Sequence, residues 1–224
     1  MAKPTFKRNA PTKTVGKKIL IACEGKQTEP KYFNAIRQDL RLTTVQVLIL
    51  PHDGTDPLSV VKAVLESRKE KKREKTWLDD QDSAWAVFDG DEHIANNRPN
   101  WCQAIQIAKS QKINLAITNP SIEFWYLIHF QDHSAIIARD KAKDRLKQHI
   151  PNYDKTRCYY LEKLKEMTKG AIARANKLDE LAKQNQLPEY SNPCCSGISQ
   201  LVEMMLKMGD RFYYLRDLPI EKET

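Results

Sequence analysis

The chain has 224 residues, of which 41% are hydrophobic and 29% charged, an ordinary composition for a soluble globular protein. No apolar run approaches the ~18 residues of a membrane span, and residues 1–18 lack the apolar core of a signal peptide. We therefore expect a cytoplasmic protein. The formal net charge of +8 favours a polyanionic partner such as nucleic acid, because basic side chains attract phosphates.

Four regions follow one another along the chain. We expect a basic flexible arm over 1–16, an α/β domain over 17–138, a helical extension on the same core over 139–215, and a tail over 216–224. The arm is proline-rich and basic, with little to bury. The extension is assigned because no convincing strand follows residue 139.

Strands and helices are predicted to alternate in the first of the folded regions. Apolar runs predict strands at 18–23, 45–50, 83–88 and 114–118. Apolar spacing and capping residues predict helices at 28–40, 56–75, 99–110 and 119–130, then at 140–149, 156–185 and 196–208. The helix at 119–130 is expected to use Asn119 as its N-cap. Because parallel strands need crossover connections, the alternation predicts a mainly parallel sheet with flanking helices.

Several polar features have an ordinary structural explanation. The mixed charge of residues 66–75 is typical of a solvated helix face, although a role in nucleic-acid binding is the alternative. Cys194 and Cys195 are expected to be ordinary thiols rather than a redox pair, and the chain has no CxxC or zinc spacing. His129 is expected to be a buried core histidine rather than a base. Core positions are also expected at Trp125, Tyr126 and Phe130.

Carboxylates follow three of the predicted strands. Glu24 follows the first strand, Asp89 and Asp91 follow the third, and Glu123 lies in the first turn after the fourth. Because the carboxyl ends of parallel strands meet at one edge of a sheet, we expect these carboxylates to cluster. Their repulsion would be costly without a cation, and oxygen ligands suit Mg²⁺ (or Mn²⁺) better than Zn²⁺. The sequence therefore predicts a metal site.

Each acid also has a structural explanation. Asp89-Gly-Asp91 could form a turn and cap a helix. Glu123 lies where a helix dipole favours a carboxylate, and Glu29, in the first turn of its helix, carries the same ambiguity. Glu92 is expected to be a solvated acid or one that supports the ligands. Acids at strand ends in a basic protein suggest phosphoryl chemistry, but phosphatases and response-regulator-like folds share this layout.

Four segments resemble the RloB-like family. They are CEGKQTEPKYF (23–33), VFDGDEH (87–93), NPSIEFWYLIHF (119–130) and NPCCSGISQLV (192–202). The first two also look like the two motifs of Toprim proteins, a strand ending in Glu-Gly and a later strand ending in Asp-x-Asp. The resemblance implies a Toprim/Rossmann-like fold and a metal-dependent phosphodiesterase, that is, a nuclease acting on DNA or RNA, tRNA included. It further implies a role in bacterial anti-phage defence, through abortive infection, or in restriction, with an AAA- or ABC-type ATPase partner.

The resemblance also implies roles for individual residues. The Toprim acids carry over to Glu24, Asp89 and Asp91, and the acid of the NPSIEFW motif carries over to Glu123. Together with Lys26, which could neutralise charge on the reacting phosphate, these are the candidate catalytic residues, although an exposed loop lysine is equally consistent with the sequence. Cys195 stands where the family tends to place Thr, which puts a role for that position in doubt.

A non-catalytic regulatory subunit is the alternative function. Such a subunit would bind nucleotide or nucleic acid within an ATPase complex without cutting anything. The intact Glu24, Asp89 and Asp91 argue against it. The sequence has no Walker A motif, so ATP hydrolysis by the chain itself is not expected. Self-association into a homo-oligomer stays open.

Overall fold

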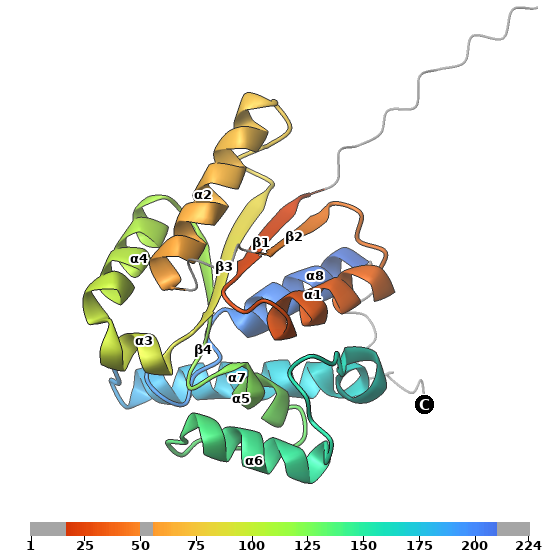
Figure 1. The fold of residues 1–224 in the computed structure, drawn as a ribbon, viewed down its shortest axis with the longest axis vertical. Helices are drawn as coiled ribbons and strands as arrows, with labels where there is room; N and C mark the ends of the chain where they lie inside the picture. Colours follow the sequence, from red (N-terminus) through yellow and green to blue (C-terminus); the bar gives the residue numbers. More distant parts are fainter. Residues whose placement is uncertain (1–16, 50–55, 210–224) are drawn as a thin grey trace, which may run out of the picture.

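The computed structural model describes residues 17–49 and 56–209, and it places a four-stranded, all-parallel sheet at the centre of the molecule (Figure 1). The strands are β1 (Ile19–Cys23), β2 (Val45–Ile49), β3 (Ser83–Asp89) and β4 (Asn114–Thr118). Their spatial order is β2-β1-β3-β4. The parallel sheet with helices on both faces confirms the predicted α/β fold, in the arrangement expected of a Toprim/Rossmann-like protein.

The helices connect the strands and then fill the C-terminal third of the chain. They are α1 (Thr28–Asp39), α2 (Pro57–Arg73), α3 (Asp91–Asn96), α4 (Arg98–Ser110), α5 (Ile122–Leu127), α6 (Arg139–His149), a π-helix η1 (Tyr160–Leu164), a 3₁₀-helix η2 (Lys165–Met167), α7 (Thr168–Gln184) and α8 (Ile198–Gly209). Figure 1 shows α2 and α4 on one face of the sheet, and α1 and α8 on the other. No helix in the described ranges is long and apolar enough to cross a membrane.

The sheet separates two hydrophobic cores. Successive residues of a strand point to opposite faces, so Ile19 and Ile21 of β1 pack with α1 and α8, whereas Leu20 and Ala22 pack with α2 and α4. Burial on both faces explains why β1 reads as an uninterrupted apolar run. The first core also contains buried residues of α5, α6 and α7. The boundary at residue 139 between the α/β domain and the helical extension stays a prediction. The predicted arm (1–16) and tail (216–224) lie outside the described residues.

Two of the predicted helices differ from those observed. The helix predicted at 119–130 begins only at Ile122, with Ser121 at the N-cap. Asn119 is not the cap, because its backbone forms a bridge with Cys194, with both N···O distances 2.8 Å. The helix predicted at 156–185 is broken, since η1 and η2 precede α7. Leu50, predicted as the last residue of β2, lies outside the described residues.

The segment after α7 extends the edge of the sheet beside β4. Ile117 N donates to Ser196 O at 2.8 Å, and Gly197 has a φ of +81°. A Cβ at Gly197 would lie 1.8 Å from the Leu115 carbonyl oxygen, so only glycine permits this approach. Burial raises the pKa of the Cys194 thiol to about 12 and that of Cys195 well above its usual range. Both are therefore inert packing thiols, as the sequence predicted.

His129 lies in the core. Its ring Nδ1 is 2.9 Å from the Trp125 carbonyl oxygen, and 1% of the residue is exposed. Burial lowers the pKa of His129 to about 4, so the ring is neutral at physiological pH. Trp125 and Tyr126 are buried beside it and Phe130 packs against the same core, as expected.

Candidate functional site

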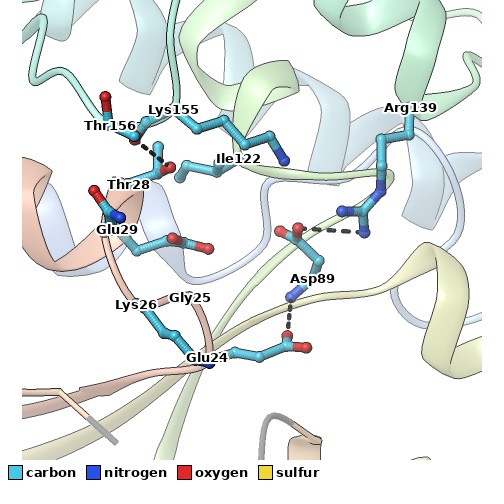
Figure 2. Close-up of a pocket in the computed structure, with 11 residues that line it drawn as sticks. Glu24, Gly25, Lys26, Thr28, Glu29, Asp89, Ile122, Arg139, Lys155 and Thr156 are labelled. Carbon is cyan, nitrogen blue, oxygen red and sulfur yellow. Dashed lines mark hydrogen bonds and ion pairs between the residues drawn. The ribbon is translucent and has the colours of Figure 1, made fainter. Parts of the chain in front are cut away.

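A pocket of about 330 Å³ opens at the carboxyl edge of the sheet (Figure 2). Its lining contains the acids Glu24, Glu29 and Asp89 and the cations Lys26, Arg139 and Lys155. The acids come from the ends of β1 and β3 and from the first turn of α1. Arg139 begins α6, and Lys155 lies in the loop after that helix. The ends of β1 and β3 and the first turn of α1 thus supply the acids, and the part of the chain from α6 onward supplies two of the cations.

Glu24 and Asp89 are joined at the ends of neighbouring strands. The backbone N–H of Asp89 donates to Glu24 Oε2 at 3.1 Å. On its other oxygen, Glu24 Oε1 lies 2.6 Å from His93 Nε2. Thr118, at the end of β4, donates its hydroxyl to Asp89 Oδ1 at 2.7 Å. The predicted placement of these two acids at one edge of the sheet is thus what the structure shows, and both are held in fixed orientations.

Asp91 is engaged by an arginine. The Arg139 guanidinium donates to Asp91 Oδ2 at 3.0 Å and to Asp91 Oδ1 at 2.5 Å, and it also lies 3.3 Å from Asp89 Oδ2. Both aspartates of the Asp-x-Asp motif therefore share one cation. Asn192 helps to position Arg139 through the backbone two residues before it. The Asn192 side-chain amide accepts a hydrogen bond from the Ile137 N–H and donates one to the Ile137 carbonyl oxygen.

Glu29 reaches into the pocket over Gly25. A Cβ on Gly25 would lie 2.0 Å from Glu29 Oε2, so the absence of a side chain makes room for this carboxylate. Burial raises the pKa of Glu29 to about 7, and the charges of Glu24 and Glu123 add to the rise. Burial and the charge of Glu29 raise the pKa of Asp89 well above its usual range, against the opposing charge of Arg139. Negative charge is thus crowded in this pocket.

Glu123 lies behind the pocket and does not line it. It is 1% exposed, receives hydrogen bonds from Ser121 at 2.6 Å and from the Tyr153 hydroxyl at 3.2 Å, and lies 3.2 Å from Lys155 Nζ. Burial raises the pKa of Glu123, but the Ser121 bond and the charge of Lys155 outweigh that effect and hold the pKa below its ordinary value. Glu123 therefore does not share the pocket lining with Glu24 and Asp89, although its charge acts on Glu29, and its ion pair holds Lys155 in place.

The donor chemistry of the pocket fits a divalent cation. Glu24, Asp89 and Glu29 offer carboxylate oxygens, which Mg²⁺ and Mn²⁺ prefer. Burial is the main cause of the raised pKa of Asp89 and Glu29, and a cation would relieve the repulsion between neighbouring acids that adds to it. As the side chains stand, no group of three His, Cys, Asp or Glu residues within 17–49 and 56–209 is arranged to hold a metal ion. Asp91 is turned to Arg139 and would have to exchange that partner to become a ligand.

A family model described as RloB-like protein matches residues 19–205. This chain belongs to the RloB-like family. The match spans every residue of the pocket, since those residues lie between Glu24 and Thr156. No curated protein and no solved structure matches the chain.

Sequence reasoning overlooked three residues of this RloB-like site. His93 was within reach, because it lies two positions after Asp91 in a segment already singled out for its resemblance to the family. Arg139 and Lys155 carried no signal, because both come from a basic helical region far along the chain. Lys155 reaches the pocket because the Thr28 hydroxyl donates to its carbonyl oxygen at 3.0 Å. Lys26, which was singled out, lines the pocket as expected of a residue next to the acids.

Proposed function

We propose that this RloB-like chain is a metal-dependent phosphodiesterase that cuts DNA or RNA, tRNA included. The observation that carries the proposal is a pocket, at the carboxyl edge of a parallel sheet, whose lining combines three carboxylates with three cations. Metal-dependent phosphodiester cleavage uses both kinds of group, carboxylates to hold a divalent cation and positively charged side chains to hold the anionic phosphate. Open α/β sheets place their sites at this edge.

The acids would hold Mg²⁺ or Mn²⁺ through Glu24 and Asp89, with Glu29 and Asp91 as further donors. When bound, the ion would polarise a phosphate oxygen and make a bound water more acidic. The chain prepares these ligands by fixing Glu24 through the Asp89 backbone N–H and His93, and Asp89 through the Thr118 hydroxyl. Preset ligands need little rearrangement when a cation arrives.

The cations would hold the phosphate. Arg139 presents planar paired donors, a geometry that suits phosphate as well as carboxylate, so it can bind the substrate from its present position beside the aspartates. Lys155 is aimed by Glu123, and its side chain remains 48% exposed, so the ammonium can reach both its carboxylate partner and a substrate oxygen. Lys26 belongs to the lining of the same pocket, next to Glu24 (Figure 2).

The biological setting belongs to the same proposal and rests on the family membership. It comprises a cytoplasmic role in bacterial defence or restriction beside an ATPase partner. A non-catalytic regulatory subunit is the second candidate. The observation that favours it is the Arg139 bridge, which satisfies Asp89 and Asp91 without a metal ion.

A cleavage assay separates these functions. The full chain is incubated with total RNA and with plasmid DNA in Mg²⁺ or Mn²⁺, alone and with the neighbouring ATPase. We expect metal-dependent cuts that disappear in Glu24→Gln and in Asp91→Asn. The matched control is Glu70→Gln, which removes an exposed carboxylate on α2. Wild-type protein that cuts nothing in any mixture, or cuts that persist in a folded Glu24→Gln variant, would contradict the proposal.

A further inference from the structure

A second hollow, of about 680 Å³, runs along the outer face of α1. One wall is α1, with Lys31, Asn34 and Arg37, and the other is the segment at η1, with Leu161 and Glu162. Lys26 belongs to the lining of this groove and also to that of the acidic pocket. The groove therefore begins where the pocket ends.

The polar side chains that α1 contributes to the groove are arranged along a line. The cations Lys31 and Arg37 and the amide Asn34 between them are spaced three residues apart, and such positions lie on one side of a helix. The α1 residues of the lining run from 30 to 38, which corresponds to about 12 Å along the helix axis. A chain lying on this face would meet Lys26, Lys31 and Arg37 in succession as it left the pocket.

These cations are available to a ligand. Within the described part of the chain, no carboxylate lies within ion-pair distance of Lys26 or Arg37, and Arg37 Nε is buried without a hydrogen-bond partner. Lys31 Nζ donates only to neutral oxygens, the Gln27 side chain at 2.9 Å and the Thr156 carbonyl. The acid of the lining, Glu162, is neutralised by Arg157 at 2.8 Å. A phosphate would supply the anionic partner that Lys26 and Arg37 do not find among the described residues.

The lining of the groove favours a single strand over a duplex, because it offers an apolar side chain beside the cations and an unpaired strand has free base faces to meet it. Leu161 is 60% exposed on one wall and offers an apolar surface to a sugar or a base. We propose that this groove between α1 and η1 holds the backbone of a single-stranded stretch of nucleic acid as it leaves the acidic pocket. The inference rests on the proposed function, because it assigns the substrate's path through the same site.

Binding can be measured without cleavage. Full-length protein in EDTA is titrated into a short fluorescein-labelled single-stranded oligonucleotide, as RNA and as DNA, over a series of KCl concentrations, with fluorescence anisotropy as the readout. The double variant Lys31→Gln/Arg37→Gln should bind about tenfold more weakly at moderate salt, and its salt slope should be smaller by about 1.4, since each single-strand phosphate contact contributes about 0.7. Arg37→Gln alone should lower the slope by about 0.7 and serves if the double variant does not fold.

The matched control removes the same charges elsewhere. Lys62→Gln/Arg73→Gln replaces one exposed lysine and one exposed arginine on α2, away from both hollows. It should bind the oligonucleotide like wild type. A duplex of the same sequence should be bound more weakly by wild type and should lose less from the groove substitutions than the single strand does.

Four results would overturn the groove assignment. They are unchanged binding in the groove variants, equal weakening in the α2 control, a loss on the duplex as large as that on the single strand, and displacement of the oligonucleotide by a polyglutamate peptide at equal charge. The last would assign the groove to an acidic protein instead. Because the titration contains no metal ion and no cleavage step, it can fail while the nuclease proposal stands, and it can succeed while that proposal falls.

Discussion

Replacing Arg139 with Gln should destabilise the metal-free protein and leave the metal-bound protein much less affected. The guanidinium contacts Asp91 at 2.5 and 3.0 Å and Asp89 at 3.3 Å. The Arg139 side chain is 31% exposed, that of Asp89 is 13% exposed and that of Asp91 is 23% exposed, so solvent screens this contact only in part. Glutamine keeps one amide donor on a shorter side chain and removes the charge.

The expected magnitude follows from the burial of the acids. Hydrogen bonds to charged groups contribute about 1.5–3 kcal/mol each. Asp89, whose pKa is already raised by burial, can partly compensate for the lost charge by taking up a proton, so we expect a loss of about 2 kcal/mol in the free energy of unfolding. For a chain of this size that corresponds to a fall of about 4–8 °C in Tm. A divalent cation on the same carboxylates would replace the missing charge, so saturating Mn²⁺ should close at least half of the difference.

The assay is thermal unfolding of wild type and Arg139→Gln in EDTA and in Mn²⁺. Arg157→Gln is the control, because its pair with Glu162 is 57% and 52% exposed and should change stability by less than about 0.5 kcal/mol. Equal stability of Arg139→Gln and wild type in EDTA would refute the argument from crowded charge. A difference that Mn²⁺ leaves unchanged would refute the idea that arginine and metal share the same acids.

Three further substitutions test other parts of the structure. Gly25→Ala should displace the Glu29 carboxylate, which would lie 2.0 Å from the new Cβ, and should reduce nuclease activity with little change in Tm. Gly197→Ala, with a φ of +81° and a Cβ 1.8 Å from the Leu115 carbonyl, should cost at least about 2 kcal/mol of stability, and a variant as stable as wild type in urea would contradict that. The pKa of His129 is about 4 in the folded chain against 6.5 ordinarily, so the unfolded chain takes up its proton first and stability should fall by about 3 kcal/mol between pH 6.5 and pH 4. Urea unfolding across this pH range should show the loss of stability due to His129 in wild type, and the same loss should be missing in His129→Gln.

The sheet was predictable because its strands are buried on both faces. Such strands appear as short apolar runs, and the helices between them carry a clear apolar side, so β1, β3 and β4 were assigned to within a residue at either end. The broken helix before α7 was not predictable, because its residues have the same mixed polar and apolar composition as a continuous helix. The contact of residues 194–196 with β4 is long-range and leaves no local pattern.

The acidic half of the site was also predictable, whereas the basic half was not. Glu24 and Asp89 follow neighbouring parallel strands, and the carboxyl ends of such strands lie at one edge of the sheet. Their closeness could therefore be predicted from the strand assignments alone. Glu123 belongs to α5, and the orientation of that short helix turns the carboxylate toward Tyr153 and Lys155 behind the pocket. Arg139 reaches the site through tertiary packing alone, and a single arginine in a chain with 37 basic residues gives no local signal.

Isothermal titration of the purified chain with Mn²⁺ tests the central claim most directly, because the metal site is the premise on which the proposed chemistry depends. We expect wild type to bind Mn²⁺ and Asp89→Asn to bind it at least about tenfold more weakly, with Glu70→Gln unchanged. The Asp89 variant should stay folded, since the substitution removes a buried carboxylate whose pKa is raised by burial and by the charge of Glu29. Wild type that takes up no Mn²⁺, or a folded Asp89→Asn variant that binds it as tightly as wild type, would contradict the account.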